Sequence, residues 1–163
     1  MEIVTYVDNL WILIAGILVM FMQPGFMLVE TGFTRSKNSV NIVMKNFMDF
    51  SVGALTYWAF GFAFAYGGST LGGFIAYGNF FLEGDSSTYF FQVVFAATAA
   101  TIVSGSVAER TKFSSYLLFQ PFICGLIYPI VTHWVWSGQG WLTDIGFVDF
   151  AGSGVVHMVG GFA

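Results

Sequence analysis

Residues 86–108 read SSTYFFQVVFAATAATIVSGSVA and contain no Asp, Glu, Lys or Arg. A bilayer-spanning helix needs about 20 consecutive, mainly apolar residues, and this run is long enough to supply them. Three other long stretches are also free of charged side chains: residues 9–29, 50–82 and 113–143. These runs predict an all-α integral membrane protein that crosses a lipid bilayer several times.

The overall composition also favours a membrane environment. Hydrophobic residues make up 56% of the 163 residues and charged residues only 9%, whereas soluble domains carry about 25% charged residues. Exposing so much apolar surface to water would be unfavourable. The five Lys and Arg residues are too few to follow a phosphate backbone, so the composition excludes a nucleic-acid partner.

The charged residues divide the chain into five predicted transmembrane helices within one domain, at about 9–30, 42–66, 88–108, 113–135 and 149–163. The first is a retained helix rather than a signal peptide, because no Lys or Arg precedes it. A helix over 149–163 would span only about 22 Å, against a hydrocarbon core of about 30 Å. We therefore expect the fifth helix, and with it the chain, to be truncated.

The basic residues predict the orientation of these helices. All five fall in two predicted connections, residues 31–45, which end at Lys45, and residues 109–112. By the positive-inside rule these loops are cytoplasmic, and the N-terminus lies outside a plasma membrane. The connection at 67–87 is rich in glycine, which disfavours a regular helix. We expect an external loop there, with an aromatic segment at the membrane interface.

The third predicted helix carries two patterns. Small residues recur every four positions from Ala96 to Ala108, which allows close helix packing in a membrane. Phe91 and Phe95 are also four residues apart and lie on a different face. Two such rings can close a narrow pore, or they can simply face lipid or the protein core.

Three further residues are candidates for a cation site. Trp136 is either an anchor at the membrane interface or a cation–π surface for a small cation. Asp149 either caps the fifth helix or holds negative charge beside a cation. His157 would lie near mid-bilayer, where ionisable residues are costly and mark functional sites. A neutral imidazole there could line a pore and pass hydrogen bonds or protons.

No pattern in the chain indicates an enzyme, a metal site or a cofactor. His133 and His157 belong to different predicted helices, and the single cysteine, Cys124, lies in an apolar stretch. This spacing is not typical of a metal or hydrolase motif. The glycines follow no phosphate-loop pattern.

Four stretches of the chain resemble the ammonium transporter/Rhesus-protein family. They are GFMLVETGFTRSKN at 25–38, FQVVFAATAATIVSGSVAER at 91–110, HWVWSGQGW at 133–141 and DFAGSGVVHMVGG at 149–161. All four occur in the order and at the spacing of that family, and the resemblance covers essentially the whole chain.

The resemblance implies the N-terminal half of an eleven-helix channel, built from two inverted five-helix halves and assembled as a homotrimer. It implies transport of ammonium or ammonia, with methylammonium as an analogue. By motif match, Phe91 and Phe95 would form a gate. Trp136, Phe95 and Asp149 would form an outer recruitment site for the cation. His157 would be the first of two histidines in the pore.

Two other functions fit the same residues. The membrane domain could belong to an ammonium sensor, in which it is fused to a signalling module. It could also belong to a structural subunit without a pore, in which the aromatic residues only pack or face lipid. Because we expect the chain to end within the fifth helix, it would supply only half of a pore.

Overall fold

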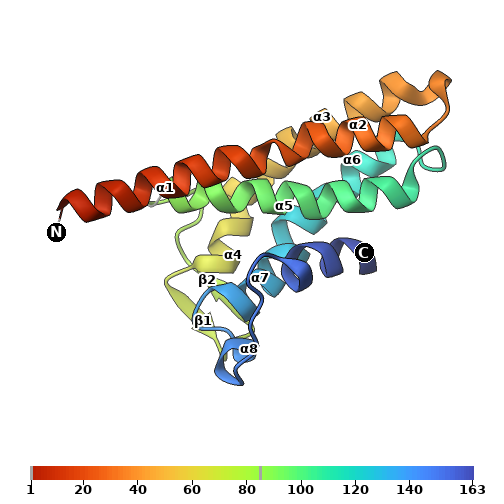
Figure 1. Ribbon diagram of the computed structural model, residues 1–163. Helices are drawn as coiled ribbons and strands as arrows, with labels where there is room; N and C mark the ends of the chain where they lie inside the picture. The colour runs from red at the N-terminus through yellow and green to blue at the C-terminus, as the bar shows by residue number, and fades with distance from the viewer. Residues whose placement is uncertain (1, 85) are drawn as a thin grey trace.

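Helices dominate the structure, because a helix satisfies its backbone hydrogen bonds within one segment. The computed structural model describes residues 2–84 and 86–163. The first helical stretch consists of α1 (Glu2–Met20) and α2 (Met22–Phe33), and it lies beside α5 (Ser86–Val107) (Figure 1). Helix α5 also packs against the second and the last helical stretches, so it is the central helix of the fold.

The remaining helices follow the other uncharged runs. The second stretch consists of α3 (Ser39–Thr56), η2 (Tyr57–Gly61) and α4 (Phe62–Tyr66). The fourth consists of α6 (Phe113–Phe122), η3 (Ile123–Ile127) and α7 (Tyr128–Trp136). The last consists of η4 (Ser153–Met158) and α9 (Val159–Phe162). Two short helices, η1 (Ser36–Asn38) and α8 (Trp141–Asp144), lie in the connections. The segments η2, η3 and η4 are π-helical turns, which often occur at functional sites.

Prolines account for two interruptions of the helices. Pro24 has no N–H, and in a regular helix its ring would clash with the carbonyl of Met20, so the first stretch breaks at Phe21. Pro121 lies inside α6, and the helix changes to the π-turn η3 two residues later. Pro129 lies in the first turn of α7, where a proline is well tolerated.

Between α4 and α5 the chain forms an antiparallel hairpin of β1 (Ser69–Leu71) and β2 (Ile75–Tyr77), which the sequence did not predict. Gly72 and Gly73 begin its turn with φ angles of 58° and 76°, a region that glycine enters without steric cost. The hairpin contacts α4 and α7, at the end of the molecule that also carries α8 (Figure 1). The predicted glycine-rich loop is therefore ordered in part by strand pairing.

Three of the described helical stretches are long and apolar enough to cross a membrane: Ile3–Phe33, Ser86–Val107 and Phe113–Asp144. The first extends beyond the predicted 9–30 at both ends. The predicted span 42–66 is helical, but the charged side chains of Lys45 and Asp49 lower its hydropathy. The last helix, Ser153–Phe162, is apolar but short. A total of five spans therefore stays a prediction.

The buried core lies where α5, η2, α7 and η4 meet. Its largest side chains are Tyr57 and Tyr128, both fully buried. The predicted ridge of small residues on α5 is also buried at Ala96, Ala100 and Ser104. Small side chains there let the neighbouring helices approach α5 closely.

Two further predicted boundaries are wrong. The connection predicted at 31–45 is shorter, because α3 begins at Ser39, and Lys45 therefore lies inside a helix. The last helix begins at Ser153 rather than at Asp149. Asp149 stands just before this helix and accepts hydrogen bonds from its first amides, which ends the extended segment and starts the helix.

Candidate functional site

Three aromatic rings form a continuous cluster between α5 and α7. The ring centroids of Phe91 and Phe95 are 5.1 Å apart, and the rings meet edge to face at 78°. Phe95 also meets the ring of Trp136, at 5.8 Å and 67°. Aromatic quadrupoles favour such edge-to-face contacts. The structure thus joins the predicted gate residues and Trp136 of the predicted recruitment site in one group, which we call the aromatic cluster.

The indole of Trp136 is also held from the side of the last helix. Its Nε1–H donates to the backbone carbonyl of Asp149 at 2.7 Å. Gly152 lies against the same ring with φ 92°, and a Cβ at this glycine would come within 3.2 Å of Trp136 Cη2 and 2.7 Å of Val156 Cγ2. A glycine is therefore needed where the chain turns past the tryptophan.

The carboxylate of Asp149 caps the last helix. Its Oδ1 accepts from the backbone N–H groups of Gly152 and Ser153, at 2.8 and 3.1 Å. Its Oδ2 accepts from those of Gly154 and Val155, both at 2.8 Å. These amides have no partner inside the helix, and a negative charge at a helix N-terminus is favourable. Capping is one of the two alternatives predicted for Asp149, and the geometry shows it directly.

His157 lies on the helix that Asp149 caps, outside the aromatic cluster. Its Nδ1 is 3.2 Å from the carbonyl oxygen of Gly152, and a carbonyl can only accept, so Nδ1 carries the proton in this bond. In the neutral imidazole, Nε2 is then an acceptor. The side chain is exposed. The described contacts therefore link four of the predicted site residues, Phe91, Phe95, Trp136 and Asp149, and leave the fifth beside them.

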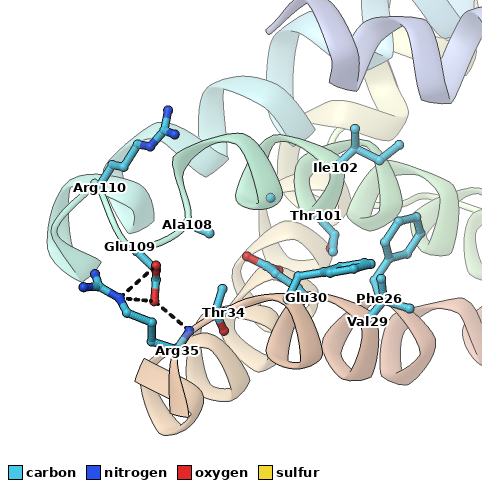
Figure 2. A pocket seen from close by; sticks show the side chains of 12 residues that line it. Phe26, Val29, Glu30, Thr34, Arg35, Thr101, Ile102, Ala108, Glu109 and Arg110 are labelled. Carbon is cyan, nitrogen blue, oxygen red and sulfur yellow. Dashed lines mark hydrogen bonds and ion pairs between the residues drawn. The ribbon is translucent and has the colours of Figure 1, made fainter. Parts of the chain in front are cut away.

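A cavity of about 520 Å³ lies between α2 and the C-terminal half of α5 (Figure 2). Phe26, Val29 and Ile102 form apolar parts of its wall, and Glu30 and Thr101 contribute polar groups. The aromatic cluster lies nearer the other end of α5, so the two features occupy different levels of one helix. Among the described residues, no group of three or more His, Cys, Asp or Glu side chains is arranged to hold a metal ion.

Glu109 is among the residues that line this cavity, and its backbone has a left-handed conformation at φ 61°. Its carboxylate accepts from the Nε of Arg35 at 3.1 and 3.2 Å and from the backbone N–H of Arg35 at 2.9 Å (Figure 2). Asn38 Nδ2 donates a further hydrogen bond at 2.6 Å. Hydrogen bonds from Asn38 and Arg35 lower the pKa of Glu109 from its ordinary value of 4.5 to about 2.

Replacing Asn38 with Ala should raise the pKa of Glu109 from about 2 toward 4.5, because the carboxylate loses its shortest hydrogen bond. The stabilisation from these donors is complete above about pH 4.5 and is lost as the pH falls toward 2, since the folded state holds the ionised form. A titration of the labelled carboxyl by NMR would measure the shift. The exposed Asn41→Ala variant is the control, and an equal shift in both variants would contradict the assignment.

A group of buried polar side chains lies near the cavity, and the sequence did not predict that they contact one another. Lys45 Nζ lies 3.7 Å from Glu30 Oε1 and donates to the carbonyl of Ser104 at 3.1 Å. Asn46 Nδ2 donates to Glu30 Oε2 at 2.7 Å, and Ser104 Oγ donates to Glu30 at 2.8 and 3.0 Å. All four side chains are at most 9% exposed. We call Glu30, Lys45, Asn46 and Ser104 the buried ion-pair network.

The sequence contained a signal for this network. Glu30 and Lys45 both fall inside predicted spans, 9–30 and 42–66, where a charge needs a partner. The predicted orientation instead counts Lys45 as a charge of the connection at 31–45. This assignment is wrong, because the ammonium group of Lys45 is buried between α2 and α5.

Comparisons with known proteins agree with one another. A family model described as the Ammonium Transporter Family matches residues 10–163. Ammonium transporter Amt2 of Archaeoglobus fulgidus is 50% identical, over 96% of this chain and 36% of its own length. Ammonium transporter 3 of Dictyostelium discoideum is 45% identical, over 96% of this chain and 37% of its own length. The chain thus spans little more than a third of these curated relatives.

Solved structures share the fold. One described as "Sensor Amt Protein" superposes with a TM-score of 0.95 at 39% identity, over 99% of this chain and 44% of its own. The crystal structure of Candida albicans Mep2 gives 0.87 at 28% identity, over 95% of this chain and 37% of its own. The curated relatives are named as transporters rather than enzymes, as predicted for this chain. Sequence and fold together show that the chain belongs to the Ammonium Transporter Family.

Proposed function

We propose that the protein carrying this chain moves ammonium or ammonia across a membrane, with the chain supplying the first part of the path. The observation that carries this proposal is the aromatic cluster, in a chain matched by the family model. Ammonium and potassium are similar in size and charge, so size alone separates them poorly. Ammonium can donate hydrogen bonds and lose a proton, and potassium can do neither.

The residues divide these tasks. Trp136 offers a ring face to the arriving cation, and Phe95 completes this recruitment surface. Phe95 is also the first barrier that the cation meets behind Trp136. Phe91 and Phe95 form the gate. Asp149 supports the recruitment site, because its backbone carbonyl holds the Trp136 indole. His157 lines the apolar lumen beyond, where its neutral imidazole accepts a hydrogen bond or a proton.

The architecture proposed for the whole protein follows the same family. The chain supplies five spans of an eleven-helix fold with two inverted halves, and three copies assemble in a plasma membrane. The basic residues other than Lys45 gather in residues 34–38 and 108–112. Both turns lie at one end of the bundle (Figure 1). The gathering of basic residues at one end supports a cytoplasmic position for these two turns and an external N-terminus.

Ammonium sensing is the second candidate function. It is favoured by the high similarity to the structure described as "Sensor Amt Protein". The membrane domain would bind the same cation in both cases. A kinase-like or cyclase-like module fused to it in the full-length protein would favour sensing, and a short cytoplasmic tail would favour transport.

Replacing Trp136 with Ala tests the proposed function. We expect the methylammonium concentration for half-maximal uptake to rise about tenfold, the effect of losing a cation–π contact of about 1.4 kcal/mol. Uptake of labelled methylammonium by cells that express the full-length protein would measure it. Trp11→Ala is the matched control, because Trp11 lies on α1 and is 71% exposed. Equal half-saturation in both variants would count against a recruitment site at Trp136.

A further inference from the structure

His133 is buried one helical turn before Trp136, with 1% of its surface exposed. It lies in the last turn of α7 but contacts two other elements. Its Nδ1 is 2.9 Å from the carbonyl oxygen of Ala65 in α4, and its Nε2 is 2.9 Å from Thr70 Oγ1 in β1. One imidazole therefore ties together α4, the hairpin and α7.

The partners determine which nitrogen of His133 carries the proton. The Ala65 carbonyl can only accept, so Nδ1–H donates to it and Nε2 of the neutral ring accepts from the Thr70 hydroxyl. Ala65 lies in the last turn of α4, where carbonyl groups lack partners inside the helix. Thr70 Oγ1 also accepts from the backbone N–H of Gly73 at 3.2 Å, which ties the hairpin turn to the same histidine.

Two further bonds hold the hairpin, one to α7 and one to α8. Trp134 Nε1 donates to the carbonyl of Phe74 at 2.7 Å. The backbone N–H of Trp141 donates to the carbonyl of Gly73 at 3.2 Å. The last turn of α7 is thus fixed by the hairpin, while the side chain of Trp136, the final residue of that helix, contacts Phe95 and Asp149.

We propose that His133 is a positioning residue that, with Thr70, holds the ring of Trp136 at its place against Phe95. His133 and Trp136 are three residues apart, so they lie on neighbouring positions of one helix face. A shift of the hairpin reaches Trp136 through this turn. The inference rests on the proposed function, because it assigns His133 a role in cation recruitment rather than in passage through the lumen.

The test removes the Thr70 hydroxyl, which takes away the donor to His133 Nε2 together with the bonds of the same oxygen to the Gly73 N–H and the Ile75 carbonyl. Thr70→Val keeps the side-chain shape and lacks the hydroxyl, and Thr70→Ser keeps the hydroxyl as the matched control. In the full-length protein we expect Thr70→Val to raise the half-saturating methylammonium concentration about fivefold, because the hairpin loses the hydroxyl that joins it to His133 and ties its own turn. The maximal rate per protein molecule should stay within about twofold, and Thr70→Ser should restore wild-type half-saturation.

A spectroscopic measurement separates this inference from the proposed function. With fluorinated tryptophan, the ¹⁹F resonance of Trp136, assigned from a Trp136→Phe variant, should shift in Thr70→Val and not in Thr70→Ser. An unshifted resonance in Thr70→Val would overturn the positioning role, whether or not the protein transports. Unchanged half-saturation, or a loss confined to the maximal rate, would overturn it in a transporting protein. Absent methylammonium uptake by the wild-type protein would contradict the proposed function alone.

Discussion

Replacing Lys45 with Met should lower the free energy of unfolding by about 3–5 kcal/mol, because the carboxylate of Glu30 would stay buried without its cationic partner. The substitution also removes the donor to the Ser104 carbonyl and the ammonium group 4.6 Å from the Tyr116 ring centre. Met keeps a similar length and an apolar stem, so the lost charge is the main change. Denaturant unfolding of the detergent-solubilised full-length protein would measure the difference.

Two further variants make this prediction specific. Lys37→Met removes an exposed lysine from the turn before α3 and should change stability by less than about 0.5 kcal/mol. The double variant Glu30→Gln/Lys45→Met removes both charges and should recover much of the lost stability, because a buried pair gives little net stabilisation over uncharged side chains. If Lys45→Met were no more destabilising than Lys37→Met, the buried ion-pair network would not exist as described.

Replacing His157 with Asp should lower the selectivity for methylammonium over potassium by more than about tenfold. An apolar lumen makes an intact cation costly, which excludes potassium. A carboxylate about 4 Å from a cation attracts it by about 4 kcal/mol at an intermediate dielectric, enough to change the ratio by this amount. Uptake of labelled methylammonium and of rubidium, as a potassium substitute, would measure the ratio in cells.

The control for this experiment is His157→Gln. It keeps an uncharged side chain that can donate to the Gly152 carbonyl, so potassium should stay excluded. Equal selectivity in the wild-type protein and the Asp variant would mean that His157 does not face the permeation path. The assignment of the pore histidine would then be wrong, even with the aromatic cluster in place.

The helices of this protein were predictable because hydrophobicity and length are local properties. The uncharged runs at 86–108 and 113–143 correspond closely to α5 and to the stretch from α6 to α7. The hairpin Ser69–Tyr77 was not predictable in the same way. Its strands have three residues each, and the hairpin is held by hydrogen bonds to α7, a distant part of the chain.

Spacing alone predicted that Phe91 and Phe95 share one helix face, since residues four apart are neighbours in a helix. Only the packing of α5 against α7 brought Trp136 onto Phe95, because that contact joins residues far apart in the sequence. The same holds for Glu30 and Lys45. Their burial and pairing depend on how α2, α3 and α5 meet, and a charge pattern read along the chain records neither.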